Sequence, residues 1–202
     1  MEKNLKAHWE TVYETKSPQE VSWTQEIPKM SLDFIENVEL TKDASIIDIG
    51  GGDSLLVDYL LKQGFTNLTV LDISSAAIER AKIRLGEKSN LVHWIISDIN
   101  EFQANEIYDL WHDRAAFHFL TDPKQIEQYM QLVSKHALNV VTGTFSTEGP
   151  LKCSGLEITQ YNEEKLIQLY QTVGFECVET KREDHQTPFG TSQNFVFASF
   201  RK

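Results

Sequence analysis

From Ser45 onward the chain alternates short runs of β-branched residues with amphipathic stretches of helical period. Strands separated by helices of this length form a parallel sheet, because a parallel neighbour is reached only through a crossover connection. Five runs have this character: Ser45–Ile49, Leu68–Leu71, Leu91–Ile96, Tyr108–His112 and Val140–Phe145. The sequence therefore predicts an α/β fold around a parallel sheet.

The C-terminal part of the chain breaks this alternation. Phe175–Thr180 and Asn194–Phe200 have strand composition, and only a loop over residues 182–192 separates them. Two strands joined without a helix pair antiparallel, as a hairpin. We therefore expect seven strands, the last of them reversed.

The first 44 residues precede the alternating region. Leu5–Thr15 and Pro28–Val38 predict two helices, and no linker or low-complexity tract separates them from the first predicted strand. A length of 202 residues suits one domain better than two. We expect one domain over residues 1–202, with residues 1–44 as a helical lid and residues 45–202 as the core.

Composition excludes several classes of protein. The chain is 41% hydrophobic and 24% charged, as globular proteins are. Its apolar runs fall short of the roughly 18 residues that a membrane helix needs, and the N-terminal residues lack the apolar segment of a secretory signal. Thirty acidic residues against 19 basic ones give a net charge of −11, which disfavours a nucleic-acid partner. We expect a cytoplasmic protein with a small-molecule partner and no membrane partner; the sequence leaves the oligomeric state open.

The two cysteines, Cys153 and Cys177, have no C-x-x-C spacing and no histidine at metal-ligand spacing. We therefore expect neither a disulfide framework nor a metal site.

A glycine turn, Gly50-Gly51-Gly52, follows the first strand and opens the next helix. Open α/β sheets bind ligands at this place, where glycines let a ligand touch the backbone. Leu55 stands where a dinucleotide motif has its third glycine, which disfavours a nicotinamide-dependent oxidoreductase. Asp53 beside the turn favours a ligand that carries positive charge.

Asp72 and Asp98 end the next two strands in the same way. A carboxylate at such a position accepts hydrogen bonds from both hydroxyls of a ribose, although either aspartate also suits the cap of a helix. Carboxyl ends of parallel strands meet at one edge of a sheet. Together with the glycine turn, the two aspartates predict a nucleoside site.

Four motifs resemble those of the class I S-adenosylmethionine-dependent methyltransferases: Asp48-Ile49-Gly50-Gly51-Gly52, Leu71-Asp72-Ile73-Ser74, Ser97-Asp98-Ile99 and Tyr108-Asp109-Leu110. The resemblance implies a Rossmann-like, mostly parallel sheet of order 3-2-1-4-5-7-6, with strand 7 antiparallel and helices on both faces. It implies S-adenosyl-L-methionine (SAM) as cofactor. The residues expected to bind it are Asp48, Gly50, Gly51, Gly52, Asp72, Ile73, Asp98, Ile99 and His112.

The residues that follow the fourth strand carry the candidate chemistry. The family places the transferred methyl group here, and Asp113-Arg114 is similar to a motif of thiopurine S-methyltransferases and, more loosely, of lysine methyltransferases. We expect Asp113, Arg114 and His118 to be catalytic: the guanidinium holds an anionic group of the acceptor, and the carboxylate orients the acceptor or takes a proton. An internal salt bridge and a buried structural histidine are the alternatives.

Aromatic residues of the N-terminal region are similar to those that cover the cofactor in small methyltransferases. Trp9 and Tyr13 share a helix face, and Trp23 follows them. Further candidates for the rim of the pocket are Cys153, Tyr161 and His185–Pro188. We predict methyl transfer to a small-molecule acceptor. A protein lysine is the alternative acceptor, and a non-catalytic SAM-binding module is the alternative class of protein.

Overall fold

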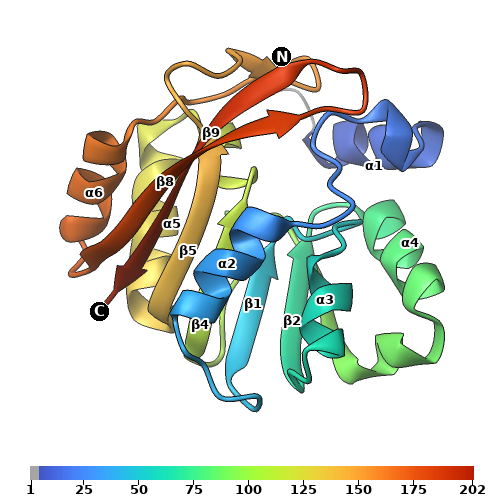
Figure 1. Ribbon diagram of the computed structural model, residues 1–202, viewed down its shortest axis with the longest axis horizontal. Helices are drawn as coiled ribbons and strands as arrows, with labels where there is room; N and C mark the ends of the chain where they lie inside the picture. The colour runs from blue at the N-terminus through green and yellow to red at the C-terminus, as the bar shows by residue number, and fades with distance from the viewer. Residues whose placement is uncertain (1–4) are drawn as a thin grey trace.

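The computed structural model describes residues 5–202, and a seven-stranded sheet of order β3-β2-β1-β4-β5-β9-β8 runs through it (Figure 1). Its strands are β1 (Ser45–Ile49), β2 (Asn67–Asp72), β3 (Val92–Ile96), β4 (Tyr108–Arg114), β5 (Ala137–Phe145), β8 (Glu176–Gln186) and β9 (Ser192–Arg201). The first five are parallel, and β9 is antiparallel to both β5 and β8. The predicted fold class and strand order are confirmed, with β9 as the seventh strand of the sheet.

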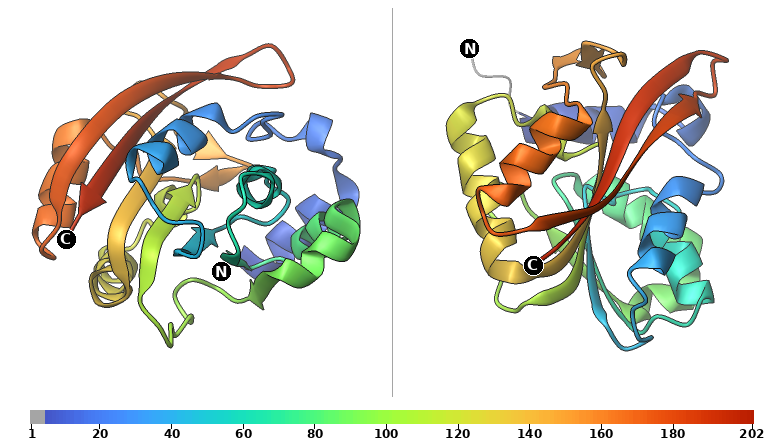
Figure 2. Two further views of the ribbon diagram at one scale, coloured as in Figure 1. Left: turned by 60° about the horizontal axis from the view of Figure 1, so that its bottom comes forward. Right: turned by 60° about the vertical axis from the view of Figure 1, so that its left-hand side comes forward.

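Helices cover both faces of the sheet (Figure 2). α5 (Pro123–His136) and α6 (Glu163–Gln171) bury one apolar cluster with the sheet, and α2 (Lys29–Asn37) and α3 (Leu56–Lys62) bury a second. The remaining elements are α1 (Leu5–Thr15), α4 (Ser75–Leu85), the 3₁₀ turns η1 (Pro18–Glu20), η2 (Gly86–Leu91) and η3 (Phe117–Phe119), and a small hairpin of β6 (Lys152–Cys153) and β7 (Leu156–Glu157). The sequence did not predict this small hairpin.

Side-chain caps begin three of the helices, α4, α5 and α6. Ser74 Oγ accepts a hydrogen bond from Ala77 N, Asp122 caps α5 and Asn162 caps α6. α3 begins at Leu56 without a side-chain cap. The glycine turn extends through Ser54, whose hydroxyl accepts from Leu56 N at 3.1 Å.

Five strands extend beyond their predicted bounds, β2, β4, β5, β8 and β9, and two of these extensions bear on the site. β4 continues to Arg114, which pairs with Gly143 of β5. β8 continues to Gln186, so the predicted loop shrinks to residues 187–191. Residues 181–186 are all polar and lack the apolar alternation of a strand; their pairing with the buried strand β9 holds them in the sheet.

The N-terminal segment, residues 5–44, contains the two helices that the sequence predicts. α1 contacts α4 and lies beside it in Figure 1. The loop that follows α1 reaches the C-terminal hairpin, where the carbonyl of Ser22 lies 2.7 Å from Nε2 of His185. Residues 1–4 of the predicted lid lie outside the described part of the chain. None of the helices in residues 5–202 is long and apolar enough to cross a membrane.

Candidate active site

A cavity of about 720 Å³ lies where β1 to β4 end, and the N-terminal segment contributes much of its lining. Its volume is within the range of pockets that bind cofactors and small molecules. The lining includes most of the predicted cofactor residues: Asp48, Gly50, Gly51, Asp72, Ile73, Asp98, Ile99 and His112. Gly52 is the exception, because it lies behind the wall against Asp72 and Ala77.

The glycine turn leaves no room for side chains. Gly50 has a φ of +66°, which favours glycine, and its N–H donates to the carbonyl of Leu71 at 2.8 Å. A Cβ on Gly51 would lie 2.4 Å from the Asp48 carboxylate, and one on Gly52 would lie 2.5 Å from that of Asp72. The turn is therefore pressed against two buried carboxylates, and Gly50 and Gly51 offer bare backbone to the cavity.

Asp72 is 5% exposed and lies at the end of β2. Its Oδ1 accepts a hydrogen bond from Ser74 N at 2.8 Å. Burial raises the pKa of Asp72 to about 7, against the backbone hydrogen bond from Ser74, and the nearby carboxylates of Asp48 and Glu10 raise it further. The ionised form of a buried carboxylate such as this one is stabilised by hydroxyl groups that donate hydrogen bonds to it.

Asp98 lies just after β3, which ends at Ile96. Its Oδ1 accepts from the backbone N and the side-chain amide of Asn100, both at 2.9 Å. Both aspartates thus fix the turn that follows their strand and also line the cavity. Turn-fixing and ligand binding, which the sequence presents as alternatives, are compatible here.

His112 connects three elements below the cavity. Its Nδ1 is 2.6 Å from Oδ1 of Asp48 and its Nε2 is 2.9 Å from Oγ of Ser31, which is on α2. All three residues are buried. Both ring nitrogens are therefore engaged within the protein, and His112 fixes the Asp48 carboxylate beneath the glycine turn. No sequence signal marked Ser31, because its partner lies 81 residues further along the chain.

The structure separates Asp113 from Arg114. Both belong to β4, where consecutive side chains point to opposite faces. The Asp113 carboxylate accepts from Phe117 N at 2.9 Å and from the hydroxyl of Tyr129 on α5 at 2.8 Å. Burial raises its pKa to about 6, and these hydrogen bonds oppose the shift. Asp113 is absent from the cavity lining, and no ion pair joins it to Arg114 in the described chain.

Arg114 lines the cavity. Its Nη1 donates to the carbonyl of Trp23 at 3.1 Å, and the guanidinium lies 4.9 Å from the ring centroid of Phe195. Nε and Nη2 are buried and have no hydrogen-bond partner. Burial lowers the pKa of Arg114 to about 10, while the carboxylates of Glu183 and Asp48 oppose this shift. The guanidinium remains charged near neutral pH.

His118 lies in η3, outside the cavity lining. Its ring stacks on that of Phe145, with centroids 4.6 Å apart, and Nδ1 is 3.4 Å from Phe145 N. Burial, with a further contribution from the Arg114 charge, lowers the pKa of His118 to about 3. The imidazole is therefore neutral at physiological pH and packed within the fold.

Four aromatic side chains form one wall of the cavity: Trp9, Tyr13, Trp23 and Phe119. The ring of Trp9 is 5.6 Å from that of Trp23 and 5.1 Å from that of Phe119. The sequence pointed to the first three, whereas nothing local marked Phe119. Of the predicted rim residues, Cys153 lines the cavity, while Tyr161 packs on Phe117 in the core.

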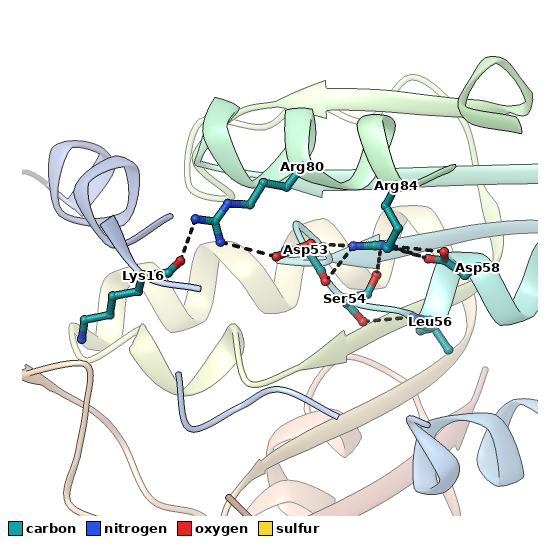
Figure 3. A network of polar contacts seen from close by, with 7 residues as sticks. All are labelled: Lys16, Asp53, Ser54, Leu56, Asp58, Arg80 and Arg84. Atoms are coloured by element: carbon teal, nitrogen blue, oxygen red, sulfur yellow. Dashed lines mark hydrogen bonds and ion pairs between the residues drawn. The ribbon is translucent and has the colours of Figure 1, made fainter. Parts of the chain in front are cut away.

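Two arginines of α4 line the cavity and contact Asp53, which directly follows the glycine turn (Figure 3). Arg84 Nη1 is 2.5 Å from Oδ1 of Asp53, and Arg80 Nη1 is 3.6 Å from Oδ2 of the same carboxylate. Arg80 also donates to the carbonyl of Lys16, just after α1. The expectation that Asp53 attracts a positively charged ligand is therefore corrected: two guanidinium groups of the protein neutralise this carboxylate.

Sheet order, glycine turn and strand-end aspartates together define the fold and nucleoside-site arrangement of a class I SAM-dependent methyltransferase. Residues 40–193 match the family model described as a methyltransferase domain. The chain belongs to this family.

The chain is similar in sequence to methyltransferases of more than one kind. A malonyl-[acyl-carrier protein] O-methyltransferase of Anoxybacillus flavithermus is 40% identical over 83 residues, which are 40% of this chain and 31% of that protein. An EEF1A lysine methyltransferase 2 of Danio rerio is 25% identical over 148 residues, 72% of this chain and 60% of that protein. The chain thus spans about a third of the first relative.

Among solved structures, a SAM-dependent methyltransferase of Anabaena variabilis has a TM-score of 0.75 at 15% identity, covering 98% of this chain and 95% of that one. The 1,6-didemethyltoxoflavin-N1-methyltransferase of Burkholderia thailandensis, solved with S-adenosylhomocysteine, has a TM-score of 0.73 at 16% identity, covering 98% and 87%. At these identities the likeness establishes the fold.

Proposed function

We propose that the protein transfers a methyl group from SAM to a small-molecule acceptor. The observation that carries the proposal is the cavity itself, which is lined by the cofactor motifs of β1, β2 and β3 and also by an aromatic wall and Arg114. A cofactor and a second small molecule would thus lie side by side.

The residues at the strand ends fit SAM. Gly50 and Gly51 present backbone that a side chain would block, which suits the methionine end of the cofactor. Asp72 would accept the ribose hydroxyls, and Ile73, Asp98 and Ile99 would line the adenine. When bound, SAM supplies an electrophilic methyl group on a positively charged sulfur, and aromatic faces such as those of Trp9 and Trp23 attract a cation.

The contribution of the protein to transfer is chiefly positioning and exclusion of water. Of the three predicted catalytic residues, we retain Arg114 as a contact to the acceptor. Asp113 acts as a positioning residue, because its carboxylate fixes the turn between β4 and η3. His118 supports the same turn by packing on Phe145.

A protein lysine is the second candidate acceptor. Relatives named EEF1A lysine methyltransferase 2 support it, and one of them matches over 72% of this chain. The positive charge of Arg114 disfavours it, because a lysine ammonium would approach a buried cation. A small-molecule acceptor remains our proposal.

Three further proposals concern the setting of the enzyme. We propose a single domain over residues 1–202, with the N-terminal segment as its lid, and a cytoplasmic location. We also propose that the protein has no nucleic-acid partner, because a net charge of −11 repels phosphate.

Two measurements test the function. In the first, SAM and S-adenosylhomocysteine should raise the melting temperature while NAD leaves it unchanged, since a ligand of the folded state stabilises it by mass action. In the second, methyl-labelled SAM is incubated with the protein and a cell extract fractionated by size. Label in the small-molecule fraction supports the proposal, and label confined to protein would favour the lysine alternative. A melting temperature unchanged by millimolar SAM would refute both.

A further inference from the structure

Arg114 lies on the side of the cavity away from Asp72 and Asp98, the residues that would hold the nucleoside of the cofactor. In the register of the sheet, Ile49 at the end of β1 pairs with Asp113, so Arg114 extends one residue past β1 and pairs with Gly143 of β5. Its guanidinium packs on Phe195 of β9. Asp72 and Asp98 lie on β2 and just after β3, in the opposite direction along the sheet. The guanidinium therefore belongs to the part of the cavity beyond the cofactor.

The charge of Arg114 lacks a close counter-ion. The other two arginines that line the cavity, Arg80 and Arg84, both pair with Asp53. Arg114 donates to one backbone carbonyl, and the described residues place no carboxylate within the 4.0 Å of an ion pair. The carboxylates of Glu183 and Asp48 are close enough to influence its pKa, but Asp48 is engaged by His112, and the buried Oε2 of Glu183 has no hydrogen-bond partner either. A buried cation in this state is costly unless a ligand brings negative charge.

We propose that the acceptor is a small organic anion whose negative group pairs with Arg114. This inference rests on the proposed function and specifies its substrate class. The amino-acid end of SAM carries both an ammonium and a carboxylate and so brings no net negative charge to the site. An anionic acceptor does, and a planar carboxylate matches the fork of a guanidinium.

The rest of this side of the cavity favours an apolar body on the same molecule. Trp9, Trp23 and Phe119 contribute ring surfaces, and Val21 and Leu120 contribute aliphatic ones. An aryl or acyl carboxylate would place its apolar part against these side chains and its charge against Arg114.

The test compares carboxylates with their neutral counterparts. Benzoate, phenylacetate, indole-3-acetate and octanoate, each with its primary amide, are titrated by calorimetry into protein saturated with S-adenosylhomocysteine. We expect at least one carboxylate to bind about tenfold or more tightly than its amide, which is the effect of a charged hydrogen bond. Arg114→Gln should abolish this preference and change the dissociation constant of S-adenosylhomocysteine less than about threefold.

Arg182→Gln is the matched control. Arg182 lies on β8 outside the cavity lining and pairs with Glu163 at 2.5 Å, so its removal changes the net charge equally. The carboxylate preference should survive it. If Arg114→Gln does not fold, Arg114→Lys takes its place in the test. Lysine keeps the positive charge but lacks the planar guanidinium, so this variant should reduce the preference for the carboxylate without abolishing it.

Two results would overturn the proposal. In the first, no carboxylate of the set binds more tightly than its amide to the wild-type protein. In the second, Arg114→Gln weakens S-adenosylhomocysteine binding tenfold or more, which would assign the guanidinium to the carboxylate of the cofactor. Failure of S-adenosylhomocysteine to bind at all would instead refute the proposed function, and the anion comparison is then made on the free protein.

Discussion

The two sides of the cavity are built in different ways. On the cofactor side, each contact belongs to a short motif at the end of its strand: Asp72 is the last residue of β2, and the glycine turn directly follows β1. On the other side, Trp9, Trp23, Arg114 and Cys153 come from segments that are far apart in the sequence. A binding surface made of strand ends is therefore encoded locally, whereas one made of an N-terminal segment and a hairpin depends on how the whole chain packs.

Removing residues 1–24 should separate the two sides most sharply. Trp9, Tyr13 and Trp23 would be lost, together with the carbonyls that accept from His185 and Arg114, while every strand remains. We expect methyl transfer to fall about 100-fold or more, because positioning and exclusion of water are lost. Binding of S-adenosylhomocysteine should weaken much less. Turnover equal to that of the full chain would show that these residues are no lid.

Asp72→Ala should affect the cofactor side alone. The carboxylate would accept two ribose hydroxyls, and charged hydrogen bonds contribute about 1.5–3 kcal/mol each, so we expect S-adenosylhomocysteine affinity to fall at least about 100-fold. The melting temperature of the free protein should change little, since burying this carboxylate is itself unfavourable. Calorimetry and thermal melts measure both quantities. Asp43→Ala, a change at an exposed aspartate outside the cavity lining, is the control for loss of charge.

The pKa of Asp72 gives the cofactor side a pH dependence. Burial raises this pKa from 3.8 to about 7. The folded state therefore holds the proton more tightly than the unfolded state, and the stability of the free protein falls as the pH rises from about 4 through 7. Ribose hydroxyls favour the ionised form, so affinity should rise about tenfold between pH 6 and pH 8.

The ligand for this measurement is 5′-deoxy-5′-methylthioadenosine, which keeps the ribose and adenine and lacks the titrating amino acid. Asp72→Asn should bind it with the same affinity at both pH values. A pH dependence that persists in the asparagine variant would assign the titration to another group.

What could be predicted from the sequence also differs between the two sides of the cavity. The sheet order and the cofactor motifs are predictable, because β-branched runs, glycines and strand-end aspartates are local signals. The separation of Asp113 from Arg114 required knowing that β4 continues to Arg114, which depends on its pairing with Gly143 of β5. Likewise the polar run 181–186 became a strand only through β9.

Glu10 joins the N-terminal segment to the cofactor side, and no sequence signal marked it. Its carboxylate accepts from Ser75 N at 2.8 Å, Ala76 N at 3.0 Å and the hydroxyls of Ser74 and Ser75, so a residue of α1 caps the first turn of α4. Partial burial raises the pKa of Glu10, but the hydrogen bonds from Ser75, Ala76 and Ser74 prevail and bring it to about 2. A group with a depressed pKa stabilises the fold above its unfolded pKa, and this contribution is lost as the pH falls towards 2.

Glu10→Gln should therefore lower the free energy of unfolding at pH 7 by about 1 kcal/mol, the typical contribution of a helix cap, and by less as the pH falls below about 4.5. Glu14→Gln, an exposed change on the same helix, is the matched control and should have no such effect.

Because the Glu10 charge also raises the pKa of Asp72, removing this charge should move the midpoint of the pH-dependent binding to lower pH. Denaturant melts and the pH titration of binding measure the two effects. If Glu10→Gln matches Glu14→Gln in both, the two sides of the cavity are not coupled through this carboxylate.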